Sequence, residues 1–134
     1  MDEMVLRIND PELCYVFARN ARRKGRPELA LQAYRRAVEL RAEQHDVECE
    51  AERRALRAIY AYEEALSHHK GKRTRATGTW QMVRRYGILP TICRRLRARD
   101  SEDMLPALRE LGLDDYSFQA VREAFPERFA QSAC

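Results

Sequence analysis

The fold is decided by residues 28–69, which read ELALQAYRRAVELRAEQHDVECEAERRALRAIYAYEEALSHH. No Gly or Pro interrupts this stretch, and its small and apolar residues recur in alternating steps of about three and four, the spacing of one helix face. Such a heptad-like seam predicts a helix that pairs with another helix, so its residues are a candidate homodimer contact. The seam positions are Ala33, Ala37, Leu40, Val47, Ala51, Ala55, Ala58 and Tyr62.

The length of this predicted helix sets a condition on the fold. At about 1.5 Å per residue it would be roughly 60 Å long, whereas a compact chain of this size has a radius of gyration of about 14 Å. The helix must therefore protrude, pair with a partner chain or break. Residues 41–54 are mostly polar, so we expect either a break or an exposed rod there.

Local signals place further helices on both sides of this stretch. Asp10, Pro11 and Glu12 have the order of an N-cap, a first helical residue and a first-turn acid, which predicts a helix over 11–24 that Gly25 ends. Pro27 then opens the long helix, so the two form a hairpin. After Gly71, a basic loop and short helices near 80–86, 90–99, 104–111 and 115–125 are expected.

We therefore expect an all-α fold without β-strands. A helical hairpin with an extended second helix would occupy residues 1–69, and a basic loop with a bundle of short helices would occupy residues 70–134. The two parts are expected to share one continuous core.

The segment 14–40 resembles a tetratricopeptide repeat. Small or bulky residues stand where that motif places them, within and around the phrase ALQAYRRAVEL: Ala18, Ala21, Ala30, Tyr34 and Ala37. The sequence departs from the family because no proline follows the second helix, and no second repeat appears 34 residues on. The resemblance thus implies two helices packed through small residues rather than a peptide-binding groove. The phrases RATGTWQMVRRYGI and GLDDYSFQAVREAFPERF are similar to small helical bacterial proteins, which implies the same fold class and a cytoplasmic location.

Charge is distributed very unevenly along the chain, whose net charge is +4. Residues 69–99 carry ten basic side chains and no acidic one, whereas residues 100–134 carry three basic and eight acidic ones. So dense a basic block repels itself, which indicates either an anionic partner or contact with the protein's own acidic helices. The basic residues are Lys70, Lys72, Arg73, Arg75, Arg84, Arg85, Arg94, Arg95, Arg97 and Arg99.

Residues 79–97 can be aligned with a helix-turn-helix in which Gly87 is the turn glycine. In that register six residues are predicted to be buried, and four are predicted to face outward. The buried set is Met82, Val83, Tyr86, Ile88, Cys93 and Leu96. The outward set is Thr91, Arg94, Arg95 and Arg97. The arginines could contact phosphates or guanine edges, with residues 70–75 as a flexible basic arm. Trp80 and Tyr86 are either core residues or, if exposed, surfaces for stacking single-stranded bases.

These patterns predict a nucleic-acid-binding protein that uses the ten basic residues of 70–99. The alternative is an interaction or adaptor module that dimerises, or binds an acidic protein surface, through the long helix. His45, Cys49 and Glu52 share a helix face but lack a further metal ligand, and no catalytic signature is present, so we expect no enzyme activity, metal or cofactor.

Cellular location and thiol chemistry follow from what the sequence contains. It has no run of 18 apolar residues and no basic-then-apolar leader, so a cytoplasmic protein without membrane contact is expected. Cys14, Cys49, Cys93 and Cys134 lie far apart and are expected to be free thiols.

Overall fold

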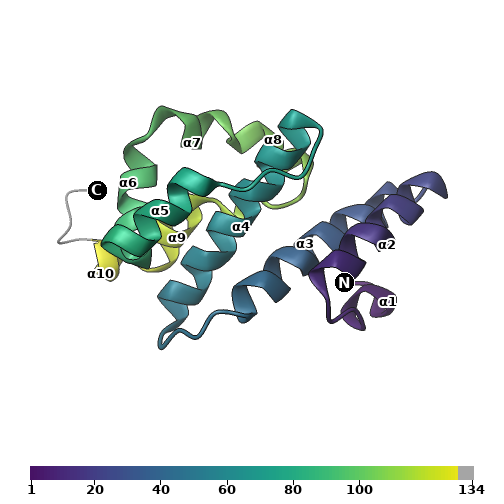
Figure 1. Ribbon diagram of the computed structural model, residues 1–134, viewed down its shortest axis with the longest axis horizontal. Helices are drawn as coiled ribbons and strands as arrows, with labels where there is room; N and C mark the ends of the chain where they lie inside the picture. The colour runs from purple at the N-terminus through teal and green to yellow at the C-terminus, as the bar shows by residue number, and fades with distance from the viewer. Residues whose placement is uncertain (130–134) are drawn as a thin grey trace. The chain divides into compact units, whose positions relative to one another are not determined.

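A computed structural model describes residues 1–129, without the side chains of residues 100 and 101. Helices joined by turns and short loops make up most of these residues, and no strand occurs among them (Figure 1). The predicted all-α class is confirmed. The chain divides into two compact units, residues 1–46 and residues from 47 onward.

The first unit is the predicted helical hairpin. Helix α1 (Glu3–Leu6) precedes α2 (Pro11–Arg23) and α3 (Pro27–Glu43). The Asp10 side chain accepts a hydrogen bond of 3.0 Å from the Glu12 N–H and so caps α2. Gly25 turns the chain with a φ of +73°, which a residue without a Cβ adopts at little cost. The alanines of the tetratricopeptide-like pattern are buried between α2 and α3, where small side chains permit close helix packing.

The predicted long helix is broken inside the polar stretch 41–54. Helix α3 ends at Glu43 and α4 (Glu50–Lys70) begins after a non-helical connection over 44–49. The connection contains His45, Asp46 and Val47, which are weak helix formers, and no apolar stripe is present to hold such residues in a helix. Of the three outcomes that the length argument allowed, the structure has the break.

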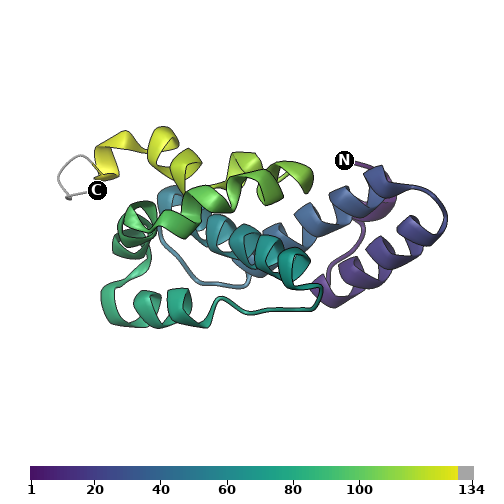
Figure 2. The same ribbon diagram turned by 90° about the horizontal axis from the view of Figure 1, so that it is seen from above.

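The second unit is built around α4. Short elements follow it: α5 (Thr77–Tyr86), α6 (Ile88–Arg97), α7 (Arg99–Asp103), α8 (Leu105–Glu110), the 3-10 turn η1 (Asp114–Tyr116), α9 (Phe118–Ala124) and α10 (Pro126–Phe129). Helices α6, α8 and α9 contact α4 directly. Leu56 and Ile59 of α4 are fully buried, as are Ile92 of α6 and Val121 of α9. The segment after α4 turns back alongside it before α5 begins (Figure 2).

Two sequence-based predictions are wrong because of the break. The boundary between the parts lies at residues 46 and 47 rather than at 69 and 70, since α4 packs with the short helices that follow it. The seam is divided between α3 and α4, and all of its residues except Val47 are buried within the single chain. The seam is therefore no exposed surface for a second helix.

None of the helices among residues 1–129 combines the length and the apolar character that crossing a membrane requires.

Candidate nucleic-acid interface

The basic loop that follows α4 is attached to α4 rather than free. The Arg73 guanidinium donates to both carboxylate oxygens of Glu64 at 2.7 Å, and only 2% of the Glu64 side chain is exposed. The Ser67 hydroxyl accepts from the Thr74 N–H at 2.9 Å and contacts the Thr74 carbonyl oxygen at 3.3 Å. The prediction of a flexible arm over 70–75 is therefore wrong, because α4 supplies polar partners one and two turns before its end.

Glu63 of α4 holds the start of α5 by two hydrogen bonds. Its Oε2 atom accepts a hydrogen bond from the Ala76 N–H at 2.8 Å and another from the Trp80 indole N–H at 2.6 Å. Trp80 is only 6% exposed, and its ring lies 4.9 Å from the Tyr60 ring, centroid to centroid. Trp80 is thus a core residue and does not offer a face for a base. We call the contacts of Glu63, Glu64 and Ser67 with residues 73–80 the loop anchor.

The helix pair predicted around Gly87 is present, but its joint is shorter than that of a helix-turn-helix. Helix α5 ends at Tyr86 and α6 begins at Ile88, so Gly87 alone connects them, with a φ of +94°. A helix-turn-helix has a turn of three to four residues. The first turn of α6 also carries Ile88, Leu89 and Pro90, which cannot donate side-chain hydrogen bonds to base edges.

The faces of α6 differ from the predicted ones at four positions. Ile88 and Leu96, expected inside, are only half-buried. Thr91 and Arg95 were expected outside, yet Thr91 is fully buried and Arg95 is 7% exposed. They are four residues apart and share the face turned to the core. The Arg95 guanidinium carbon lies 4.7 Å from the centre of the Tyr62 ring and 5.6 Å from that of Phe118, so aromatic faces accommodate its charge. Arg94 and Arg97 are exposed, as predicted.

Exposed arginines gather around α6, next to the end of α5 and to α10. The Arg94 guanidinium carbon lies 3.6 Å from the centre of the Tyr86 ring, and that of Arg85 lies 5.3 Å from it. Tyr86, predicted to be buried, is exposed at 36%, and its ring contacts two guanidinium groups. Arg94 and Arg97 also line a pocket of about 220 Å³ together with Arg128. We call Arg85, Arg94, Arg97 and Arg128 the arginine surface.

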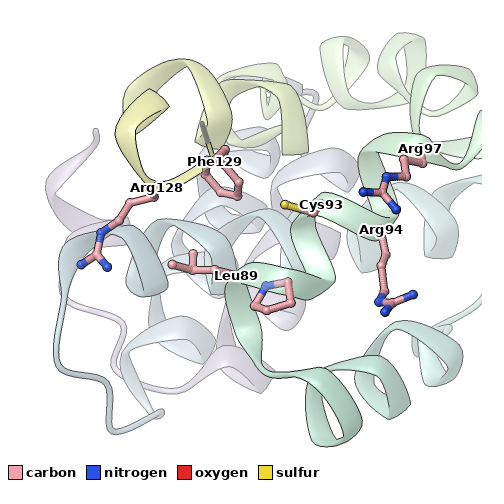
Figure 3. Close-up of a pocket in the computed structure, with 7 residues that line it drawn as sticks. Leu89, Cys93, Arg94, Arg97, Arg128 and Phe129 are labelled. Carbon is pink, nitrogen blue, oxygen red and sulfur yellow. The ribbon is translucent and has the colours of Figure 1, made fainter. Parts of the chain in front are cut away.

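The pocket has an apolar floor between its arginines. In Figure 3, Arg94 and Arg97 lie on one side and Arg128 on the other, with Leu89, Cys93 and Phe129 between them. Pro90 also lines the pocket, and none of the described residues that line it carries a carboxylate. Arg128 belongs to this site although the sequence contains no signal for it, because it stands outside the acid-free segment and beside Glu127.

The remaining basic residues are distributed over the second unit. Lys70, Arg75 and Arg95 line a separate cavity of about 400 Å³ at the start of α5. Lys72, Arg84 and Arg99 are exposed elsewhere. Among the residues that the structure describes, no carboxylate forms an ion pair with Lys70, Lys72, Arg75, Arg84, Arg85, Arg94 or Arg99. The acidic helices after residue 100 thus leave most of this charge exposed, and Arg73 is the clear exception.

The cysteines and the candidate metal ligands are spread over both units. Cys14 and Cys49 are free thiols as predicted, but Cys93 is disulfide-bonded, so the prediction is wrong there; Cys134 lies outside the described residues. The Cys49 thiol contacts a Glu52 carboxylate oxygen at 3.5 Å. Residues 1–129 bring together no group of three or more His, Cys, Asp or Glu side chains that could hold a metal ion.

No protein-family model, curated protein sequence or solved structure matches this chain.

Proposed function

We propose that the second unit binds single-stranded nucleic acid through the arginine surface. The observation that carries the proposal is the 220 Å³ pocket, which sets an apolar floor between Arg94, Arg97 and Arg128 and has no carboxylate among the described residues that line it. Guanidinium groups bind phosphate oxygens in a planar, bidentate manner. Phosphates would therefore lie on the rim, and a base that is unstacked from its neighbours would lie on the floor.

A single strand suits this surface better than a duplex. In a duplex the bases are stacked inside, and a protein reads them with polar side chains inserted in a groove. The exposed start of α6 offers Leu89 and Pro90 instead, and the one-residue joint at Gly87 lacks the geometry of a groove-reading helix pair. Bases of a single strand have accessible faces that pack on apolar and aromatic groups irrespective of sequence. Binding would thus depend on phosphates, with little sequence preference.

The salt dependence of binding tests this proposal. Each phosphate neutralised on a single strand contributes about 0.7 to the slope of log K against log salt, so four arginines predict a slope of about −2.8. Raising the salt from about 50 to about 200 mM should then weaken binding about fiftyfold. The assay is fluorescence polarisation of a labelled oligothymidine. Binding that is absent at low salt, or that is insensitive to salt, would contradict the proposal.

A pair of variants with the same charge change locates the site. Arg94→Ala with Arg97→Ala should reduce the slope by about 1.4, so that the same salt step weakens binding only about sevenfold. Arg19→Ala with Arg23→Ala removes two exposed arginines from α2 in the first unit and serves as the control. If both double variants change the slope equally, binding follows net charge and not the arginine surface.

A further inference from the structure

The cavity at the start of α5 is a second cationic site, distinct from the arginine surface. It is open to solvent, has a volume of about 400 Å³ and is lined by the end of α4, the anchored loop, the start of α5 and one residue of α6. Its positive charges come from three different elements: Lys70 ends α4, Arg75 stands in the loop and Arg95 comes from α6. Tertiary packing therefore gathers three cations that are distant along the chain, with no carboxylate among the residues that line the cavity.

Burial strengthens the electrostatic interaction that one of these charges can make with a ligand. Arg95 is 7% exposed, and its charge acts inside a medium of lower dielectric constant than water, where electrostatic interactions with a ligand are stronger. Lys70 and Arg75 are exposed at the cavity, so their side chains can approach a ligand from the solvent side. One buried cation, Arg95, together with two exposed cations, Lys70 and Arg75, favours a compact ligand of high negative charge.

The backbone adds hydrogen-bond donors to the same cavity. Thr77, Gly78 and Thr79 line it and form the first turn of α5, where backbone N–H groups have no partner within the helix. No side chain forms the N-cap hydrogen bond of α5, and Gly78 places no side chain over the turn. Thr74 also lines the cavity, and its hydroxyl group donates to the Lys72 carbonyl oxygen at 2.9 Å. A tetrahedral anion with several acceptor oxygens would find both charge and donors here.

The other side of the cavity is apolar. Tyr62 and Leu66 of α4 and Met82 of α5 line this side. The volume exceeds what a bare phosphate ion fills and falls in the range of small-molecule pockets, about 300 to 1,000 Å³. The geometry points to an organic phosphate monoester, whose phosphate group meets Lys70, Arg75 and Arg95 while its carbon-containing part packs on Tyr62, Leu66 and Met82. We propose this cavity as its binding site.

The loop anchor is what makes the cavity. Arg73 on Glu64, Thr74 on Ser67 and Ala76 on Glu63 hold residues 73–76 against α4, so that Arg75 lines the same cavity as Lys70. Within the loop anchor, Arg73 forms an ion pair with Glu64. Its neighbours Arg75 and Lys72 form no ion pair among the described residues. The polar side chains of α4 thus build the cavity wall, and the proposal does not depend on nucleic-acid binding by the arginine surface.

Isothermal titration calorimetry with inorganic phosphate and with adenosine 5′-monophosphate tests the site. Both should bind saturably at low salt, and the nucleotide should bind more tightly because it also covers the apolar side. Lys70→Gln with Arg75→Gln should weaken both about tenfold or more, the effect of losing hydrogen bonds to a charged group. Absence of saturable binding of either compound to the wild-type protein overturns the proposal.

A matched control separates the cavity from general charge effects. Lys72→Gln with Arg84→Gln removes the same charge from exposed positions that do not line the cavity, and should leave phosphate affinity within about twofold. Equal weakening by both double variants overturns the proposal. If Arg94→Ala with Arg97→Ala abolishes phosphate binding while Lys70→Gln with Arg75→Gln does not, the anion binds on the arginine surface and the proposal is overturned. Failure of the oligonucleotide assay and failure of this one are therefore distinguishable. Oligonucleotides with and without a 5′-phosphate show whether the monoester can be a strand end.

Discussion

Replacing Glu63 by Ala should strongly destabilise the second unit, because this carboxylate joins α4 to α5. Its Oε2 atom holds the Ala76 N–H and the Trp80 indole N–H, and Glu63 is only 9% exposed. Truncation would leave two donors unsatisfied on residues that are 5% and 6% exposed. At about 1–3 kcal/mol for each buried unsatisfied group, the loss in unfolding free energy should be about 4 kcal/mol. Against a total stability of about 5–15 kcal/mol, this is a large fraction.

Glu63→Gln should be much milder than Glu63→Ala. Both donors bond to the same oxygen, so the amide oxygen of Gln can accept both, and only the extra strength of a charged acceptor is lost. That difference is about 1 kcal/mol. The comparison also remains informative if Glu63→Ala does not fold.

Urea unfolding, followed by far-ultraviolet circular dichroism and by fluorescence, measures both variants. Trp80 is the one tryptophan of the sequence, so its emission reports directly on the anchored region. Glu50→Ala is the control: this carboxylate on the same helix is 65% exposed and lies 3.6 Å from Arg57, so its loss should cost less than about 1 kcal/mol. The reasoning is refuted if Glu63→Ala unfolds within about 0.5 kcal/mol of the wild type, or if Glu63→Gln is as costly as Glu63→Ala.

Three further changes test other parts of the structure. Gly87→Ala should lower the free energy of unfolding by about 1–3 kcal/mol, because the φ of +94° and ψ of 170° at this position suit only glycine. An unchanged melting temperature would contradict this account of the connection between α5 and α6. Ala55→Leu should lower the free energy of unfolding by about 1–3 kcal/mol by overpacking a fully buried site, without altering the sedimentation coefficient. A change of association state would instead support the seam as a contact between two copies of the chain. Tyr86→Ala should weaken oligothymidine binding about two- to fivefold by releasing Arg94 from its ring, as polarisation would measure, and equal affinity would show that the ring does not orient the arginine.

Much of the helix pattern was predictable because helix ends depend on neighbouring residues. The cap at Asp10, the proline at Pro11 and the turn at Gly25 act within a few residues, so the hairpin follows from local chemistry. The length of the predicted long helix allowed three outcomes, and the break at 44–49 was one of them. The contact surface was mispredicted, because periodicity identifies a buried face without identifying what buries it.

In the candidate site, some positions follow from neighbouring residues in the sequence, and others depend on residues of distant helices. An acid-free segment between 69 and 99 indicates an anionic partner, and Arg94 and Arg97 are exposed as their helical positions suggested. The inward position of Arg95 was not predictable from its own helix, because the Tyr62 and Phe118 rings that cover it come from α4 and α9. Arg128 joins the arginine surface from α10 for the same kind of reason.

By itself the sequence determined the all-helical class, the hairpin and the location of the basic segment, because helix propensity, caps and charge density are properties of short stretches. The tertiary structure decided how the ten basic residues are divided: Arg73 is paired with Glu64, Arg95 is buried, and the others are exposed on the surface or at two separate cavities. The physical reason is that the free energy of a charged side chain depends on its burial and on the carboxylates and rings around it, and those neighbours come from helices far along the chain.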